Sequence, residues 1–188
     1  MKFNMRCLRV AGLGVLAGLL AGLVAGIVAR IDMRIVALSA GMPPTFTVGG
    51  SLNIALIGAI LGAPFGMAFA FVKPYLPGPP QGWLVKGFTF GVGLFLAFVL
   101  PLYLWQPDFR SELAFAPGLL GIGLFGALPL FYGILVGLIT PRLDRRLPAD
   151  LWPRSAALVG FVALLIVGLA GFGLVMYGIV LAIVEAGR

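Results

Sequence analysis

Histidine is absent from this sequence, and cysteine and acidic residues are scarce. The 188 residues include no histidine, one cysteine and six acidic residues. Without an imidazole, the chain cannot use histidine as a metal or haem ligand or as a general base. The single cysteine, Cys7, cannot form a disulfide within the chain and lacks the apolar, small-residue context of a lipoprotein cleavage site. We therefore expect no metal, no cofactor and no redox role for Cys7.

Charge of either sign is also scarce. Charged residues make up 10% of the chain and hydrophobic residues 61%, whereas a soluble domain has roughly 25% charged residues. The mean hydropathy is +1.13. This composition predicts an integral membrane protein. The net charge of +7 is spread too thinly between apolar runs to line a nucleic-acid groove. It indicates contact with anionic lipids at the cytoplasmic face of the bilayer instead.

Five apolar stretches are long enough to cross the hydrocarbon core, which takes about 20 helical residues. They cover residues 8–29, 52–72, 84–105, 117–140 and 156–184. The first resembles a signal peptide because basic residues precede it, but its apolar run exceeds the roughly 7–15 residues of a signal core. A retained helix is therefore favoured over a cleaved signal. The sequence predicts an all-α bundle of five transmembrane helices that form one domain over residues 1–188.

The distribution of lysine and arginine predicts the orientation of these spans, because such residues concentrate in cytoplasmic loops. Nine of the thirteen would lie on the side of the N-terminus. This bias places the N-terminus in the cytoplasm and the C-terminus outside. We expect the protein to be multi-pass in a cell (inner) membrane, with a prokaryotic source favoured.

Groups able to perform catalysis are lacking inside the spans. A charge within a membrane is costly and indicates function by default, but only Arg9 and Lys86 fall within the stretches, each near an entrance. Neither paired carboxylates at helical spacing nor a serine with a nearby base is found. Asp32 and Arg34 follow the first stretch in an expected helical extension, where we expect both to be solvated charges rather than a solute-binding pair. The sequence therefore predicts no catalytic residues and no enzyme.

Small residues recur at regular spacing in the first two stretches. Glycine is unfavourable in a helix in water, but in a bilayer it lets helix backbones approach closely. Because the two helices would be antiparallel, residues at matching depth should meet. The predicted helix-packing residues are Gly14, Gly18, Gly22 and Gly26, opposite Gly58, Gly62 and Gly66.

Two prolines and a few polar residues define a possible solute site. Prolines inside spans free backbone carbonyls, and matching interruptions in two halves of a transporter point to its binding site. The alternatives are that the kinks only shape packing, and that Ser51 or Asn53 caps a helix; both alternatives are favoured. The candidate solute-site residues are Thr45, Thr47, Ser51, Asn53, Pro64, Pro129 and Tyr132.

Two functions remain open from the sequence. The favoured one is a non-enzymatic accessory or scaffold subunit that packs against other membrane proteins; it predicts an uncovered glycine and alanine face and no internal cavity. The alternative is a small permease or solute-binding component for an uncharged or apolar molecule. It predicts a cavity near Pro64 and Pro129. The endings "GMAFAFVKPYL" and "GILVGLITPRL" also allow a duplicated hairpin, although glycine-rich apolar sequence gives such matches by chance.

Overall fold

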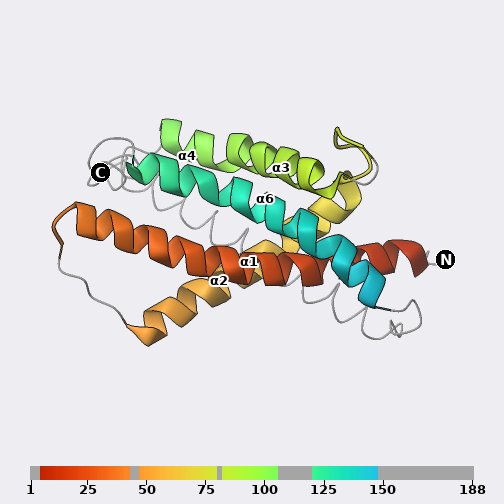
Figure 1. The fold of residues 1–188 in the computed structure, drawn as a ribbon, viewed down its shortest axis with the longest axis horizontal. Coiled ribbons are helices and arrows are strands. Elements are labelled where there is room, and N and C mark those ends of the chain that lie inside the picture. The colour runs from red at the N-terminus through yellow and green to blue at the C-terminus, as the bar shows by residue number, and fades with distance from the viewer. Residues whose placement is uncertain (1–4, 43–46, 80–81, 106–119, 148–188) are drawn as a thin grey trace, which may run out of the picture.

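A computed structural model describes residues 5–42, 47–79, 82–105 and 120–147, and the regular secondary structure of this part of the chain is all helical. Helix α1 spans Met5–Ser39 and α2 spans Val48–Val72. The third helical run joins α3 (Trp83–Leu94), the π-helical turn η1 (Phe95–Val99) and α4 (Leu100–Trp105). Helix α6 spans Leu120–Arg146. The long helices run along the length of the molecule (Figure 1).

Three of these helices, α1, α2 and α6, are long and apolar enough to cross a membrane, by length and composition. The all-helical prediction and the membrane-type composition of these helices are therefore confirmed. The run from α3 through η1 is a shorter apolar helix, Trp83–Val99, by the same measure. The fifth predicted stretch, 156–184, lies outside the described residues, so the five-span count stays a prediction.

Helix α1 is longer than the apolar stretch at residues 8–29, because it continues through the polar extension to Ser39. No glycine or proline interrupts residues 30–39. The turn that follows Ser39 reaches Gly41, whose φ of 71° is left-handed. The amide of Met42 donates to the carbonyl of Ala37 at 3.0 Å, and that of Gly41 to Leu38 at 3.1 Å. These two bonds form a Schellman cap, which satisfies the last carbonyls of the helix.

Helix α6 also passes its expected end near Thr140. It continues through Pro141 to Arg146, in a segment that we expected to be a basic loop. Side chains satisfy carbonyls around this proline: Thr140 Oγ1 donates to the Val136 carbonyl at 2.6 Å, and Arg142 Nη1 donates to that of Leu138 at 2.8 Å. Basic side chains in the last turn also suit the negative end of the helix dipole, so the helix tolerates the missing amide.

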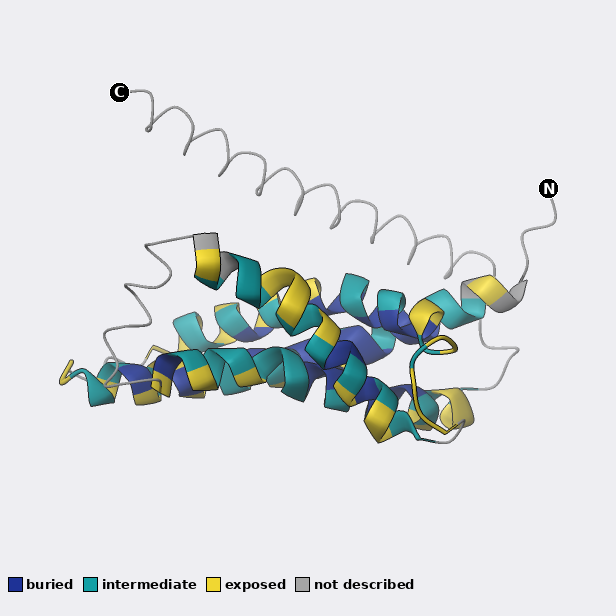
Figure 2. Cartoon of the chain, turned by 90° about the horizontal axis from the view of Figure 1, so that it is seen from above, coloured by how far each residue is buried: buried dark blue, intermediate teal, exposed yellow. Residues whose placement is uncertain are grey.

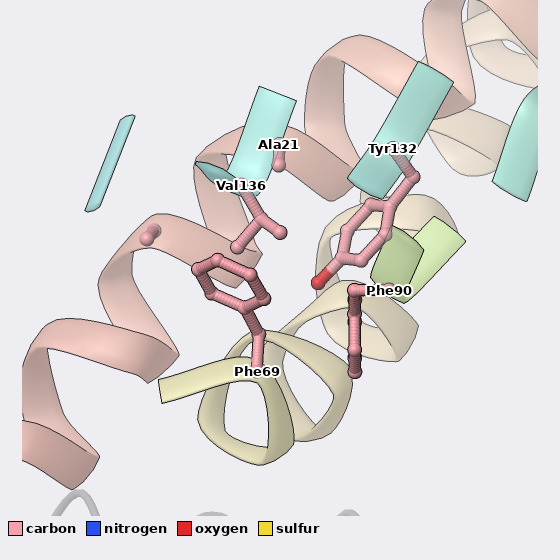
Figure 3. Close-up of a cluster of buried hydrophobic side chains, with 6 residues drawn as sticks. Ala21, Phe69, Phe90, Tyr132 and Val136 are labelled. Atoms are coloured by element: carbon pink, nitrogen blue, oxygen red, sulfur yellow. The ribbon is translucent and has the colours of Figure 1, made fainter. Parts of the chain in front are cut away.

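The helices form two hairpins, α1 with α2 and α3 with α6, and the hairpins meet mainly where α1 lies against α6. Buried residues follow the lines where helices meet, and exposed residues lie on the outer faces (Figure 2); the exposed residues include many large hydrophobic ones. At the centre, Phe69 of α2 meets Phe90 of α3 edge-to-face, with ring centroids 5.3 Å apart. Ala17, Ala21, Tyr132 and Val136 complete this cluster, most of which is labelled in Figure 3.

Candidate functional site

Glycine brings the backbones of α1 and α2 together. A Cβ atom built on Gly14 would lie 2.7 Å from the carbonyl oxygen of Gly66, and one on Gly26 would lie 2.7 Å from that of Ile54. Real Cβ contacts are essentially never this short, so only glycine fits at this separation. Between these two levels, the structure places Gly18 against Gly62 and Gly22 against Gly58.

The second hairpin has contacts of the same kind. A Cβ on Gly133 of α6 would lie 2.7 Å from the Cα of Gly91, and it would also meet the carbonyl oxygen of Gly87. A Cβ on Gly137 would lie 2.5 Å from the carbonyl oxygen of Trp83, and one on Gly91 would lie 2.6 Å from that of Pro129. The two hairpins are therefore both held by backbone contact at glycine.

An apolar groove of about 400 Å³ lies between the hairpins, with walls from α1, α2, the α3–η1 run and α6. Tyr132 is the one side chain with a polar atom among its lining residues. Small residues of α1 and α2 form one wall, and aromatic and aliphatic side chains form the others. The lining residues are Gly22, Ala25, Gly26, Ala29, Ile54, Ile57, Gly58, Leu61, Gly62, Phe65, Leu94, Phe98, Val99, Phe125, Leu128, Pro129 and Tyr132.

The hairpins are tied together at the end of the groove nearer the N-terminus of α1. The hydroxyl of Tyr132 donates to the Gly62 carbonyl at 2.6 Å, a buried bond from α6 to α2. Figure 3 shows the ring of Tyr132 among the buried aromatic side chains. An unpaired hydroxyl in an apolar interior is unfavourable, so this bond fixes how the two hairpins sit. Beyond it, the separation of the hairpins leaves the groove.

The π-helical turn η1 shapes the opposite wall. Such turns insert a residue into an α-helix and are frequent at functional sites. Phe98 and Val99 of η1 line the groove. The ring of Phe98 meets that of Phe65 edge-to-face at 5.2 Å between centroids. This contact joins α2 to η1 across the groove.

The structure places only two of the predicted solute-site residues, Pro129 and Tyr132, in the groove wall. Pro64 lies inside α2 but does not line the groove, although the next residue, Phe65, does. Among the remaining candidates, Thr47 precedes α2, Ser51 and Asn53 lie in its first turns, and none of these three lines the groove. Thr45 lies outside the described residues.

The expected capping of α2 by Ser51 or Asn53 is wrong. Helix α2 begins at Val48, with Thr47 at the N-cap position and no side-chain capping bond. Ser51 Oγ instead donates back to the Thr47 carbonyl at 3.1 Å. It also accepts a hydrogen bond from Arg30 Nε at 3.4 Å. The helix starts earlier than expected because Gly49 and Gly50 continue it toward Thr47 instead of ending it.

Asp32 corrects another expectation, because it is buried rather than solvated. Its exposed fraction is 6%, and Val36, one turn later, is also buried. The helical extension that we expected after residue 29 is present, but Asp32 and Val36 lie on a packed side of it and not in solvent. Asp32 makes no hydrogen bond or ion pair within the part of the chain that the structure describes.

Charges also meet at the opposite end of the bundle. Arg9 Nη2 of α1 lies 3.0 Å from Asp144 Oδ1 of α6. The Lys73 ammonium lies 4.8 Å from the centroid of the Trp83 ring. Burial lowers the pKa of Lys73; Asp144 opposes this change and Lys86 adds to it. Because the Arg9–Asp144 pair is half exposed, it contributes little to stability and serves to align α1 with α6.

Sequence analysis missed the aromatic wall of the groove formed by Phe65, Phe98 and Phe125. In an apolar span, a groove-lining phenylalanine has the same local signature as a lipid-facing one such as Phe88. No cluster of possible metal-ligating side chains occurs in the described ranges. Comparisons with models of protein families, with curated proteins and with solved structures find no match to this chain.

Proposed function

We propose that this chain is a non-enzymatic multi-pass membrane protein that binds an uncharged or apolar molecule in the groove between its hairpins. The groove itself carries this proposal. Its volume of about 400 Å³ falls within the roughly 300–1,000 Å³ typical of small-molecule sites. Its walls are fixed by glycine contacts within each hairpin and by the Tyr132 bond between them, so the site is pre-formed.

Sequence arguments extend this proposal to the topology. The lysine and arginine count supports five spans, a cytoplasmic N-terminus and an external C-terminus, in the inner membrane of a prokaryotic cell. In this orientation the Arg9–Asp144 pair lies at the cytoplasmic boundary, where basic residues also meet anionic lipids. The groove then belongs to the outer half of the bilayer. A solute-binding or permease component that receives apolar molecules from the outer side fits this placement.

A photoactivatable alcohol tests the groove directly. The purified protein in phosphatidylcholine nanodiscs is irradiated with hexadecanol that carries a diazirine in its chain, and the labelled peptides are mapped. We expect labelling to concentrate on residues 54–65 and 94–99. Ala25→Trp, which fills the groove from the α1 wall, should remove that labelling. The matched control Ala127→Trp places the same side chain on an exposed position of α6 and should leave it intact.

A thermal unfolding midpoint shows whether each variant folds, and Ala29→Trp, also in the groove wall, provides a second blocking variant. If groove peptides are labelled no more than lipid-facing peptides, or if folded Ala25→Trp and Ala29→Trp are labelled like the parent protein, the proposal is rejected.

The accessory-subunit hypothesis keeps one observation in its favour. A Cβ built on Gly93 of α3 or on Gly123 of α6 would meet nothing within 4 Å. Exposed glycines permit a partner helix to approach. If this function is right, a partner should co-purify in mild detergent, and Gly93→Leu with Gly123→Leu should abolish that association. Purification as a monomer that retains a small molecule would argue against it.

A further inference from the structure

We infer that the groove takes one chain of a phospholipid whose headgroup carries a primary amine, with its phosphate on Arg30 and its ammonium on Asp32. This inference rests on the proposed function and names its ligand class. It is carried by two charged side chains that follow the groove-lining residue Ala29 on α1. One is held in place by a hydrogen bond; the other belongs to a buried residue that has no partner among the described residues.

Arg30 stands where the glycine strip of α1 ends. It follows Gly26 by four residues, the same spacing that separates the glycines. Its Nε donates to Ser51 Oγ at 3.4 Å, and Ser51 precedes the groove-lining Ile54 by one turn of α2. This bond orients the guanidinium while its terminal nitrogens remain able to donate. A guanidinium with two terminal donors is suited to bidentate binding of a phosphate.

Asp32 lies on the other flank. It follows Ala29 by three residues, so it continues the groove side of α1 by one turn. Asp32 as a residue is 6% exposed and is unpartnered among the described residues. Its carboxylate oxygens are not among the fully buried atoms without a partner, so a cation can reach them and offset the cost of a charge beside an apolar environment. Arg30 is turned about 100° from Ala29 around the helix and Asp32 about 60° in the other direction, so the two residues flank the groove-lining Ala29. A headgroup that carries both a phosphate and an ammonium can bind Arg30 through the first and Asp32 through the second.

The depth of this pair agrees with a headgroup. Residues 10–29 of α1 contain no charge, and at about 1.5 Å per residue they cover roughly the 30 Å of the hydrocarbon core. With Arg9 at one boundary, Arg30 and Asp32 lie at the other. The groove runs from there toward the bilayer centre, along the direction of an acyl chain. A primary ammonium donates hydrogen bonds to a carboxylate, whereas the quaternary ammonium of choline has no N–H to donate.

Competing lipids test this assignment. Phosphatidylcholine nanodiscs containing the protein receive equal small amounts of phosphatidylethanolamine, phosphatidylglycerol or phosphatidylcholine, each with a diazirine in the same acyl chain. Labelling of residues 54–65 and 94–99 is then compared. We expect phosphatidylethanolamine to label these residues about tenfold more than phosphatidylglycerol, the factor that one charge-assisted hydrogen bond supplies. Phosphatidylcholine should fall near phosphatidylglycerol.

Substitutions at Asp32 and Arg30 test the ammonium contact and the phosphate contact separately. Asp32→Asn should reduce labelling by phosphatidylethanolamine to the level of phosphatidylglycerol, and Asp32→Glu should retain the preference. Arg30→Gln should lower labelling by all three lipids. The matched controls Asp144→Asn and Arg142→Gln change the same residue types at the opposite end of the bundle and should alter neither result.

The inference is overturned if the parent protein shows no preference for the amine headgroup, or if folded Asp32→Asn keeps it. Equal labelling by all three lipids that Ala25→Trp abolishes would reject the headgroup contacts and leave the apolar-groove function standing. Labelling that Ala25→Trp does not change would reject both.

Discussion

The two hairpins are built on the same contact, glycine backbone against backbone, but they use it over different lengths. In α1–α2 the contact extends over four levels, from Gly14 at Gly66 to Gly26 at Ile54. In α3–α6 it starts where Gly137 meets Trp83 and ends where Gly91 meets Pro129. After that point α3 passes into the π-helical turn η1, and Phe95 lies over Gly126, 3.2 Å from a Cβ built there.

This difference explains where the groove lies. The long glycine contact keeps α1 and α2 together up to Arg30, so their small residues form a flat wall. The shorter contact lets α3 change its helical geometry at η1, which brings Phe98 toward Phe65. A flat wall opposite an aromatic one leaves an apolar space between them. The length of the glycine contact therefore sets how far the two helices of a hairpin stay in backbone contact and where the groove begins.

The largest expected effect is in the first hairpin. A Cβ on Gly18 would meet the carbonyl oxygen of Gly62 and lie 2.9 Å from the Cα of Gly66. Both atoms are backbone, so the helices must separate. We expect Gly18→Ala to lower the free energy of unfolding by about 2 kcal/mol, as overpacking does. Reversible denaturation in detergent micelles measures it.

Gly93→Ala is the control, because the same added atom meets nothing within 4 Å. It should leave stability unchanged or raise it slightly, since alanine is the better helix former. Equal destabilisation by Gly18→Ala and Gly93→Ala would show that backbone contact in the first hairpin does not set the cost of the added atom.

Gly133→Ala compares the hairpins directly. Its Cβ would lie 2.6 Å from the amide nitrogen of Gly91, a clash at least as severe as that at Gly18. Because the contact in α3–α6 is shorter, α3 can shift more easily. We expect a loss of about 1 kcal/mol, smaller than for Gly18→Ala in the same denaturation assay. A larger loss than in the first hairpin would contradict the role given to contact length.

The smallest effect should come from the bond between the hairpins. Tyr132→Phe removes the hydroxyl that donates to the Gly62 carbonyl and keeps the ring in the buried cluster. We expect a loss of about 1 kcal/mol or less, typical of side-chain hydrogen bonds within membranes. Tyr75→Phe, at an 87% exposed tyrosine, should cost nothing. If the labelling pattern of the groove is unchanged in Tyr132→Phe, the bond does not set the spacing of the hairpins.

Local sequence explains part of the fold well. Long apolar runs identified the helices, because a helix in hydrocarbon must satisfy its own backbone. The helix ends were predicted less well. Helix α1 continues through the helical extension that we expected after residue 29, but α6 passes Thr140, where we expected it to stop, because side-chain bonds satisfy carbonyls around Pro141. The five spans and their orientation stay predictions.

The candidate site was predictable only where the spacing of residues along a helix determines which residues of two helices meet. Regular glycine spacing gave a contact list between α1 and α2, and the structure places those residues together. The groove wall was not predictable in this way, because Phe65 and Phe98 look like any lipid-facing phenylalanine in sequence. Ser51 was assigned to a cap because hydroxyls usually serve there, and its contact with Arg30 depends on how two helices cross.

The sequence by itself determined that this chain is helical, apolar enough for a membrane and free of histidine chemistry, because composition and periodicity are local properties. Tertiary structure decided the rest: which glycines meet, that Asp32 is buried, that Tyr132 joins the hairpins, and that a groove remains between them. Each of these depends on the distance between segments far apart in the chain. In an apolar environment that distance is set by close packing rather than by hydrophobic pattern.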